Sequence, residues 1–118
     1  MEINFGASVT NCTVAFDWTP NANYAFSNTN FWIHGNNFNG KVYFPYGATY
    51  ARVTNSFALN KMVTIPETVT NMASTFSSCY NLNQNIQIPA NVTSMVNTFY
   101  GCYNLNQNIQ IPANVTSM

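Results

Sequence analysis

A repeated unit fills the second half of this chain. It reads IPETVTNMASTFSSCYNLNQNIQ from Ile65 and IPANVTSMVNTFYGCYNLNQNIQ from Ile88, and it begins again as IPANVTSM at Ile111. The period is 23 residues. A fixed period in the twenties is typical of solenoid proteins, in which each unit buries its apolar face by stacking on the next unit. The repeat therefore predicts a stack of similar units.

Apolar residues recur in the same columns of the unit, and Asn, Gln, Thr and Ser lie between them. Because equivalent side chains of stacked units meet, we expect these columns to form one shared core. The predicted core residues are Val69, Met72, Phe76, Cys79, Leu82, Ile86, Ile88, Val92, Met95, Phe99, Cys102, Leu105, Ile109 and Ile111.

Each unit contains two kinds of local pattern. Polar and apolar residues alternate over residues 85–88, which predicts a short strand that ends at Pro89. The spacing of Val92, Met95 and Phe99 predicts a short helix or 3-10 turn. One parallel strand and one short helical arm per 23 residues indicate a β-rich α/β solenoid of the leucine-rich-repeat type.

The pattern weakens toward the N-terminus. Residues 38–62 are interpreted as a degenerate repeat, because Phe38, Val42 and Phe44 fit the strand columns, whereas the Cys-x-x-Leu segment is missing. Residues 1–37 show no repeat and are predicted to form an N-terminal cap of short strands and turns. The expected solenoid therefore spans residues 38–118, with regular repeats over 63–118 that end in mid-repeat.

Charge is scarce in this chain. It carries three basic and three acidic residues, a net charge of zero, and none of the six follows Glu67. Polarity comes from 21 Asn and 13 Thr. Nucleic-acid binding requires clustered Lys and Arg, so no nucleic-acid partner is expected. No apolar run is long enough to cross a bilayer and no signal peptide is visible, so no membrane insertion is expected either.

The residue types needed for catalysis do not gather in the sequence. The three carboxylates are isolated, His34 is the one histidine, and the cysteines lack metal-ligand spacing. We therefore predict no enzyme activity, no cofactor and no metal site. Cys79 and Cys102 share a column and should lie about 5 Å apart, within disulfide range. The preferred interpretation is nevertheless a column of buried free thiols.

Polar residues of the strand face form columns of their own. Equivalent side chains in stacked strands lie about 4.8 Å apart, so Asn and Gln should form ladders. Together with two tyrosines they suggest a neutral face for a protein or glycan ligand; a solvated face with self-satisfied amides is the alternative. The candidate face comprises Tyr80, Asn83, Asn85, Gln87, Tyr103, Asn106, Asn108 and Gln110.

The repeat resembles a known family. The order Ile-x-Ile-Pro-x-x-Val-Thr-x-Met-x-x-x-Phe-x-x-Cys-x-x-Leu is similar to BspA-like leucine-rich repeats, especially their surface-protein branch with its mycoplasma lipoprotein-associated repeats. The likeness covers residues 63–118 well and 38–62 loosely. Leu82 and Ile86 are separated by three residues, where many relatives have two. The resemblance implies a bacterial, protist or bacteriophage-encoded surface protein that binds host proteins, cells or extracellular polymers.

Two functions follow as hypotheses. The first is a non-enzymatic recognition or adhesion protein on a cell or virion surface or in the extracellular space. The second is a structural protein that assembles head to tail, because the sequence stops at Met118 in mid-repeat and would expose core columns and a strand edge. Residues 79–95 recur unchanged at 102–118, exposed positions included, which also favours a longer or stacked array.

Overall fold

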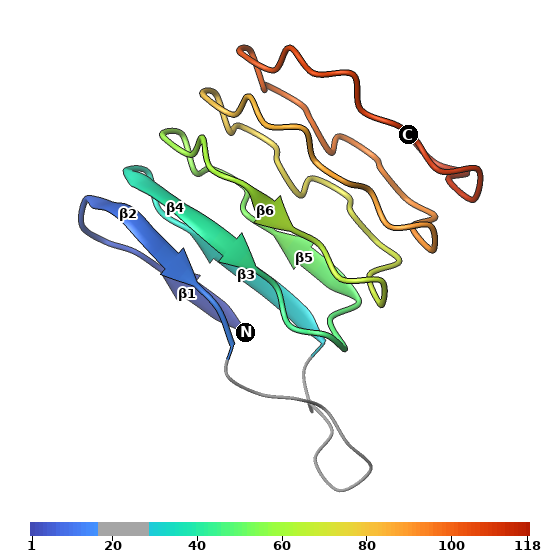
Figure 1. Cartoon of the computed structure of the whole chain (residues 1–118), viewed down its shortest axis with the longest axis horizontal. Helices are drawn as coiled ribbons and strands as arrows, with labels where there is room; N and C mark the ends of the chain where they lie inside the picture. Colours follow the sequence, from blue (N-terminus) through green and yellow to red (C-terminus); the bar gives the residue numbers. More distant parts are fainter. Residues whose placement is uncertain (17–28) are drawn as a thin grey trace, which may run out of the picture.

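The chain returns over itself at regular intervals and forms a stack of coils (Figure 1). This computed structural model describes residues 1–16 and 29–118. A column of threonines marks where each coil after the first begins, because every threonine after the first in the column donates its backbone N–H to the carbonyl oxygen of the threonine before it. These residues are Thr29, Thr49, Thr70, Thr93 and Thr116. We number the coils one to five: residues 1–16, 29–48, 49–69, 70–92 and 93–115.

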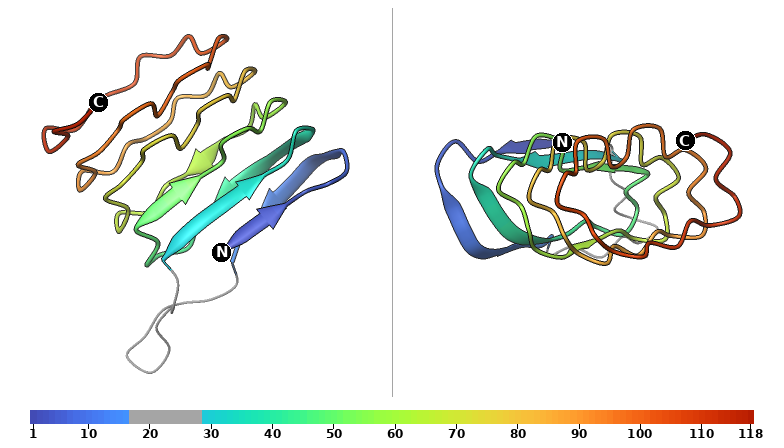
Figure 2. Two further views of the ribbon diagram at one scale, coloured as in Figure 1. Left: turned by 180° about the vertical axis from the view of Figure 1, so that it is seen from behind. Right: turned by 90° about the horizontal axis from the view of Figure 1, so that it is seen from above.

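Each of the first three coils contributes one strand to each of two parallel sheets. The first sheet has the order β1-β3-β5, with bounds Glu2–Asn4, Asn30–His34 and Tyr50–Arg52. The second has the order β2-β4-β6, with bounds Val9–Val14, Phe38–Tyr43 and Val63–Thr64. Seen from above, the coils appear as flattened loops, each offset from the one before it, with a sheet on each long side (Figure 2).

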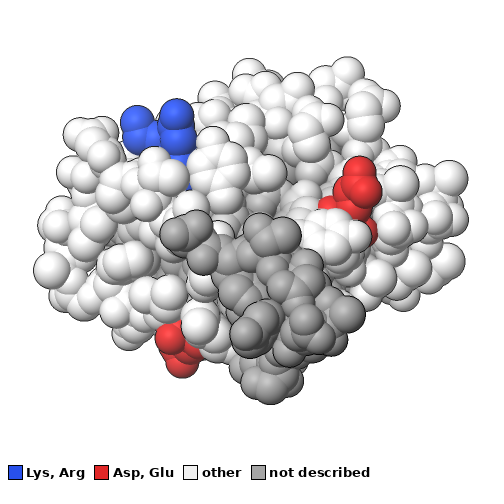
Figure 3. Space-filling model, turned by 60° about the horizontal axis from the view of Figure 1, so that its bottom comes forward, with Lys and Arg blue, Asp and Glu red and all other residues white. Residues whose placement is uncertain are grey.

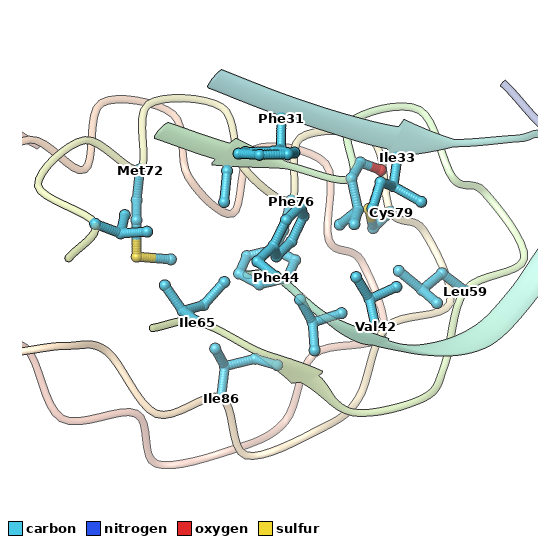
Figure 4. Close-up of a cluster of buried hydrophobic side chains, with 14 of the residues drawn as sticks. Phe31, Ile33, Val42, Phe44, Leu59, Ile65, Met72, Phe76, Cys79 and Ile86 are labelled. Atoms are coloured by element: carbon cyan, nitrogen blue, oxygen red, sulfur yellow. The ribbon is translucent and has the colours of Figure 1, made fainter. Parts of the chain in front are cut away.

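Side-chain alternation places the core between the two sheets. In β3, Phe31 and Ile33 are buried, whereas Trp32 and His34 are half-buried on the outward side. Val42 of β4 pairs with Val63 of β6, and both side chains are buried. Figure 4 shows apolar side chains from both sheets and from later coils meeting inside the loops. The interior is therefore continuous from one coil to the next.

The predicted core columns differ in burial along the stack. Eight of their side chains are at most 3% exposed, namely Val69, Met72, Phe76, Cys79, Leu82, Ile86, Val92 and Met95. Another five are half-buried, namely Ile88, Phe99, Cys102, Leu105 and Ile109. Ile111 is 42% exposed. The less buried side chains belong mainly to the fifth coil, which contacts a neighbouring coil on one side.

Residues 85–88, predicted to be a strand, do not form one. Ile86 is buried while Asn85 and Gln87 are exposed, as the alternation requires. The backbone N–H groups of Asn85, Gln87 and Ile88, however, donate no hydrogen bond to the described part of the chain. Period-two alternation reports an extended segment with one buried side; it does not report a hydrogen-bonded ladder.

The predicted helical or 3-10 arm is also not found: the described residues contain strands and turns but no helix. Ser74 and Asn97 adopt left-handed φ values of 58° and 55°, which interrupt a right-handed helix. Instead of bonding within a helix, the N–H groups of Met72 and Phe76 donate to the next coil, to Ser94 and Thr98, at 2.9 Å. The arm is thus a run of tight turns stacked on an equivalent run.

Two additional residues cause this change from strand to turns. Coils three and four are matched at two points: Tyr50 forms a bridge with Asn71, and Val53 lies over Phe76 because its N–H donates to the carbonyl of Thr75. Between these two points coil three advances three residues, from Tyr50 to Val53. Coil four advances five, from Asn71 to Phe76. The longer path cannot remain extended between the same two points, so it folds into a turn. This accounts for the lengthening of the period.

The N-terminal half takes part in the same stack. The expected boundary between residues 37 and 38 falls in the turn between β3 and β4, which belong to one coil, and residues 17–28 of the expected cap lie outside the described residues. The Cys-x-x-Leu segment is not missing from the degenerate repeat. Ser56 and Leu59 occupy its place, because Ser56 bonds to Val53 as Cys79 bonds to Phe76, and Leu59 is fully buried.

Replacing Leu82 by alanine should lower the free energy of unfolding by about 2 to 5 kcal/mol, because its fully buried side chain would leave a cavity. Asn85→Ala, three residues later and exposed, should change stability by less than about 0.5 kcal/mol. Urea unfolding followed by circular dichroism measures both. Equal losses in the two variants would contradict the placement of the core.

Candidate functional site

Three aromatic rings form a column at one corner of the coils. Phe57 stacks on Tyr80 with ring centroids 4.9 Å apart and planes inclined by 10°. Tyr80 stacks on Tyr103 at 5.3 Å and 9°. Tyr103 is 79% exposed, so the column opens to solvent. Because near-parallel stacking restrains each ring, the column is a rigid apolar platform.

A ladder of asparagines runs beside the rings. The side-chain oxygen of Asn39 accepts the backbone N–H of Asn60 at 2.8 Å. Asn60 does the same for Asn83, and Asn83 for Asn106, both at 2.9 Å. The predicted Asn83–Asn106 ladder therefore forms through backbone donors rather than from amide to amide. These asparagines hold successive coils in register.

Two glutamines complete this ladder. Gln84 donates its side-chain N–H to the side-chain oxygen of Asn60 at 3.0 Å, and Gln107 donates to that of Asn83 at the same distance. Each of these asparagine oxygens therefore accepts two donors, and its lone pairs are used. Sequence reasoning missed Phe57, Asn60 and both glutamines. Residues 79–95 and 102–118 are identical, exposed positions included, and this identity was the sequence signal that could have identified Gln84 and Gln107.

Four predicted residues carry side chains without partners. Asn85, Gln87, Asn108 and Gln110 are exposed, and the structure assigns their side chains no hydrogen bond within the described residues. Gln87 also lines a hollow of about 210 Å³ together with Met62, Val63, Thr64 and Ile65. Donors and acceptors of these four amides are available to a ligand. We call these amides, the ring column and the asparagine ladder the polar-aromatic face.

Electrostatics give this face no net charge. No residue after Glu67 is charged, so coils four and five contribute only neutral groups. Figure 3 shows the few charged side chains visible from one side, separated by broad neutral areas. No group of three or more His, Cys, Asp or Glu side chains could hold a metal ion in residues 1–16 and 29–118. Hydrogen-bonding groups and aromatic rings are therefore the chemistry that coils four and five offer on this face.

The two cysteines of the repeat are free thiols that bond to the preceding coil. The Sγ of Cys79 donates to the carbonyl of Val53 at 3.4 Å, and that of Cys102 donates to Phe76 at 3.1 Å. Burial away from water raises the pKa of Cys79 to about 12, with a further contribution from Cys102. Burial likewise raises the pKa of Cys102 to about 11. Both thiols remain protonated at neutral pH.

The fold and the face together define a repeat protein whose described coils are built from strands and turns and carry a neutral, exposed surface. Residues 51–118, more than half of the chain, match the family described as "Mycoplasma protein of unknown function, DUF285". The chain belongs to this family. No curated protein and no solved structure matches the sequence. Within the described residues, no helix has the length and apolar character needed to cross a membrane.

Stability should fall as the pH rises above 9. The unfolded thiols lose their protons near the ordinary pKa of 9.0, whereas the folded ones retain theirs up to a pKa of about 12 for Cys79 and about 11 for Cys102. The unfolded chain therefore binds fewer protons in this window, and the stability present below pH 9 is lost.

Urea unfolding at about pH 8 and about pH 10 tests this, since these values bracket the ordinary thiol pKa. The decrease in the free energy of unfolding from the lower to the higher pH should be larger in the native protein than in the Cys79→Ala/Cys102→Ala double variant. The double variant accounts for the contribution of all other groups to the pH dependence. An equal loss in both proteins would show that the thiols are not buried in solution.

Proposed function

We propose that this protein is a non-enzymatic recognition module that binds a host protein or glycan through the polar-aromatic face. The observation that carries the proposal is the column of Phe57, Tyr80 and Tyr103, which opens to solvent at Tyr103, together with exposed amides that have no partner among the described residues. Tyrosine offers a large apolar surface and a hydroxyl group, and it is enriched in binding interfaces. The face therefore combines contact area with hydrogen-bonding groups.

Rigidity supports the same proposal. The rings are held by stacking, and Asn60 and Asn83 fix the distance between coils through 2.9 Å bonds to the next backbone. When a ligand docks on a preorganised surface, the surface does not have to be ordered on binding, so less conformational entropy is lost. A larger share of the contact free energy then contributes to the binding affinity. Because coils four and five repeat the same groups at one spacing, an extended ligand with its own repeat suits this surface.

The residue order of the repeat and the family match support a proposal about fold and location. We place the chain among the BspA-like leucine-rich repeats of the surface-protein branch, on the basis of the residue order in its repeats and the mycoplasma family match at residues 51–118. On this proposal the protein acts outside the cell, on a cell surface or on a virion. The absence of charge after Glu67 supports ligands such as neutral glycans or uncharged protein surfaces over nucleic acid.

Removal of the outer ring should weaken ligand binding. Tyr103→Ala, combined with Asn85→Ala and Asn108→Ala, should reduce affinity for a bound glycan or cell surface at least about tenfold, or about 1.4 kcal/mol. A glycan array, followed by titration of the best ligand, measures the effect. Thermal unfolding checks that the variant remains folded.

Tyr46→Ala is the matched control, because Tyr46 is 60% exposed and makes no ring contact among the described residues. It should bind like the native protein. Binding that survives the triple variant unchanged would exclude the polar-aromatic face as the recognition surface.

A further inference from the structure

A second hollow lies at the N-terminal end of the same corner. Its volume is about 380 Å³, which falls within the range of about 300 to 1,000 Å³ usual for small-molecule sites. Phe5 and Trp32 line its wall, and Gly6 and Ala7 lie on its rim without long side chains. The ring of Phe5 stacks on the buried ring of Phe38 at 4.8 Å. This hollow is larger than the one beside Gln87.

The hollow exists because the aromatic column is not continued into coils one and two. The register of β4 with β6 places Asn36 level with Phe57, since Val42 pairs with Val63. The register of β2 with β4 places Ala7 level with Asn36, since Val9 pairs with Phe38. Where later coils place a ring, the first two coils place an alanine and an asparagine. Space for one more ring is left open at this corner.

The indole of Trp32 is held in place from several sides. Its Nε1–H donates to the carbonyl of Thr54 at 3.0 Å. The ring of His34 stacks on it at 3.9 Å, and the guanidinium of Arg52 lies 4.9 Å from its centroid. His34 is in turn fixed by Glu2, with 2.6 Å between Nε2 and Oε2. The wall of the hollow is therefore set before any ligand enters.

Four amide side chains surround this wall and have no partner of their own. They belong to Asn4, Asn36, Asn37 and Asn55, which line the hollow and are exposed. The structure gives none of these side chains a hydrogen bond within the described residues. Each amide offers two donors and an acceptor, so the group matches a ligand rich in hydroxyls. A hydroxyl also donates and accepts, and it needs no charged partner.

We propose that this hollow binds a neutral sugar ring, either as a free monosaccharide or as the end of a glycan chain. C–H groups of the sugar contact the part of Trp32 that lines the hollow beside the stacked His34, and its hydroxyls bond to the surrounding amides. Among the described residues that line the hollow, none is Lys, Arg, Asp or Glu, and His34 is already bonded to Glu2. Arg52, the nearby cation, lies over the rings of Trp32 and Tyr50 and is not part of the lining, so an uncharged ligand suits the lining best.

The inference rests on the proposed function, because the hollow continues the corner on which the polar-aromatic face lies, and it specifies the ligand class. Gly6→Leu is the sharpest probe. A Cβ at Gly6 meets nothing within 4 Å, and its φ is not left-handed, so the leucine fills the hollow without strain in the fold. Asn36→Ala provides a second variant, which removes an exposed amide.

Isothermal titration with glucose, galactose, mannose and N-acetylglucosamine, and with neutral oligosaccharides that end in them, tests the proposal. We expect at least one to bind. Gly6→Leu should reduce its affinity at least tenfold and Asn36→Ala severalfold, while Tyr46→Ala, outside both the hollow and the polar-aromatic face, leaves it unchanged. If the free monosaccharide binds, the ligand of the hollow is a single sugar ring. If only the oligosaccharide binds, the ligand is the end of a glycan chain.

Two results would overturn the inference. One is that no neutral sugar in the panel binds the folded protein. The other is that Gly6→Leu and Asn36→Ala bind as the native protein does. If Tyr103→Ala then abolishes binding, the polar-aromatic face stands without the hollow. If neither set of variants changes binding, the proposed function fails as well.

Discussion

Hydrogen bonds from the backbone of one coil to the next are the interaction on which this structure depends. They run through the threonine column, from Thr70 to Thr49 and from Thr93 to Thr70, and along the turns from Met72 and Phe76 to the following coil. Because they join residues about one period apart, every coil must repeat the path of its neighbour. The shared core and the columns of equivalent surface residues follow from that constraint.

The same constraint explains how a chain with few charges presents an ordered surface. Stacking of equivalent coils brings Tyr80 and Tyr103 to 5.3 Å and lets the Asn83 side chain accept the Asn106 N–H at 2.9 Å. These contacts need neither salt bridges nor metal ions. Where the first coils depart from the repeat, at Ala7 and Asn36, the column is interrupted and a hollow results. The regular coils thus carry the ring column and the asparagine ladder, and the irregular coils carry the hollow.

The sequence predicted which side chains face inward far better than it predicted the backbone. The alternation around Ile86 placed that residue in the core, but it could not report whether adjacent N–H groups are paired across coils. The spacing of Val92, Met95 and Phe99 suits a helix, yet the left-handed φ of Asn97 selects a turn. An asparagine such as Asn97 favours a left-handed turn, but the prediction gave more weight to the helical spacing of the apolar residues around it. The Trp32 hollow lies outside the regular repeat, so no column pointed to it.

Amide hydrogen exchange on the intact protein tests the central claim most directly, because it reports which N–H groups are bonded between coils. The stacked-turn structure predicts slow exchange at Met72, Phe76 and Thr93, which donate to neighbouring coils, and rapid exchange at Asn85 and Gln87, which donate to none of the described residues. The reverse pattern, with residues 85–88 protected and the turns exchanging rapidly, would contradict this account and indicate a strand ladder with unpaired turns.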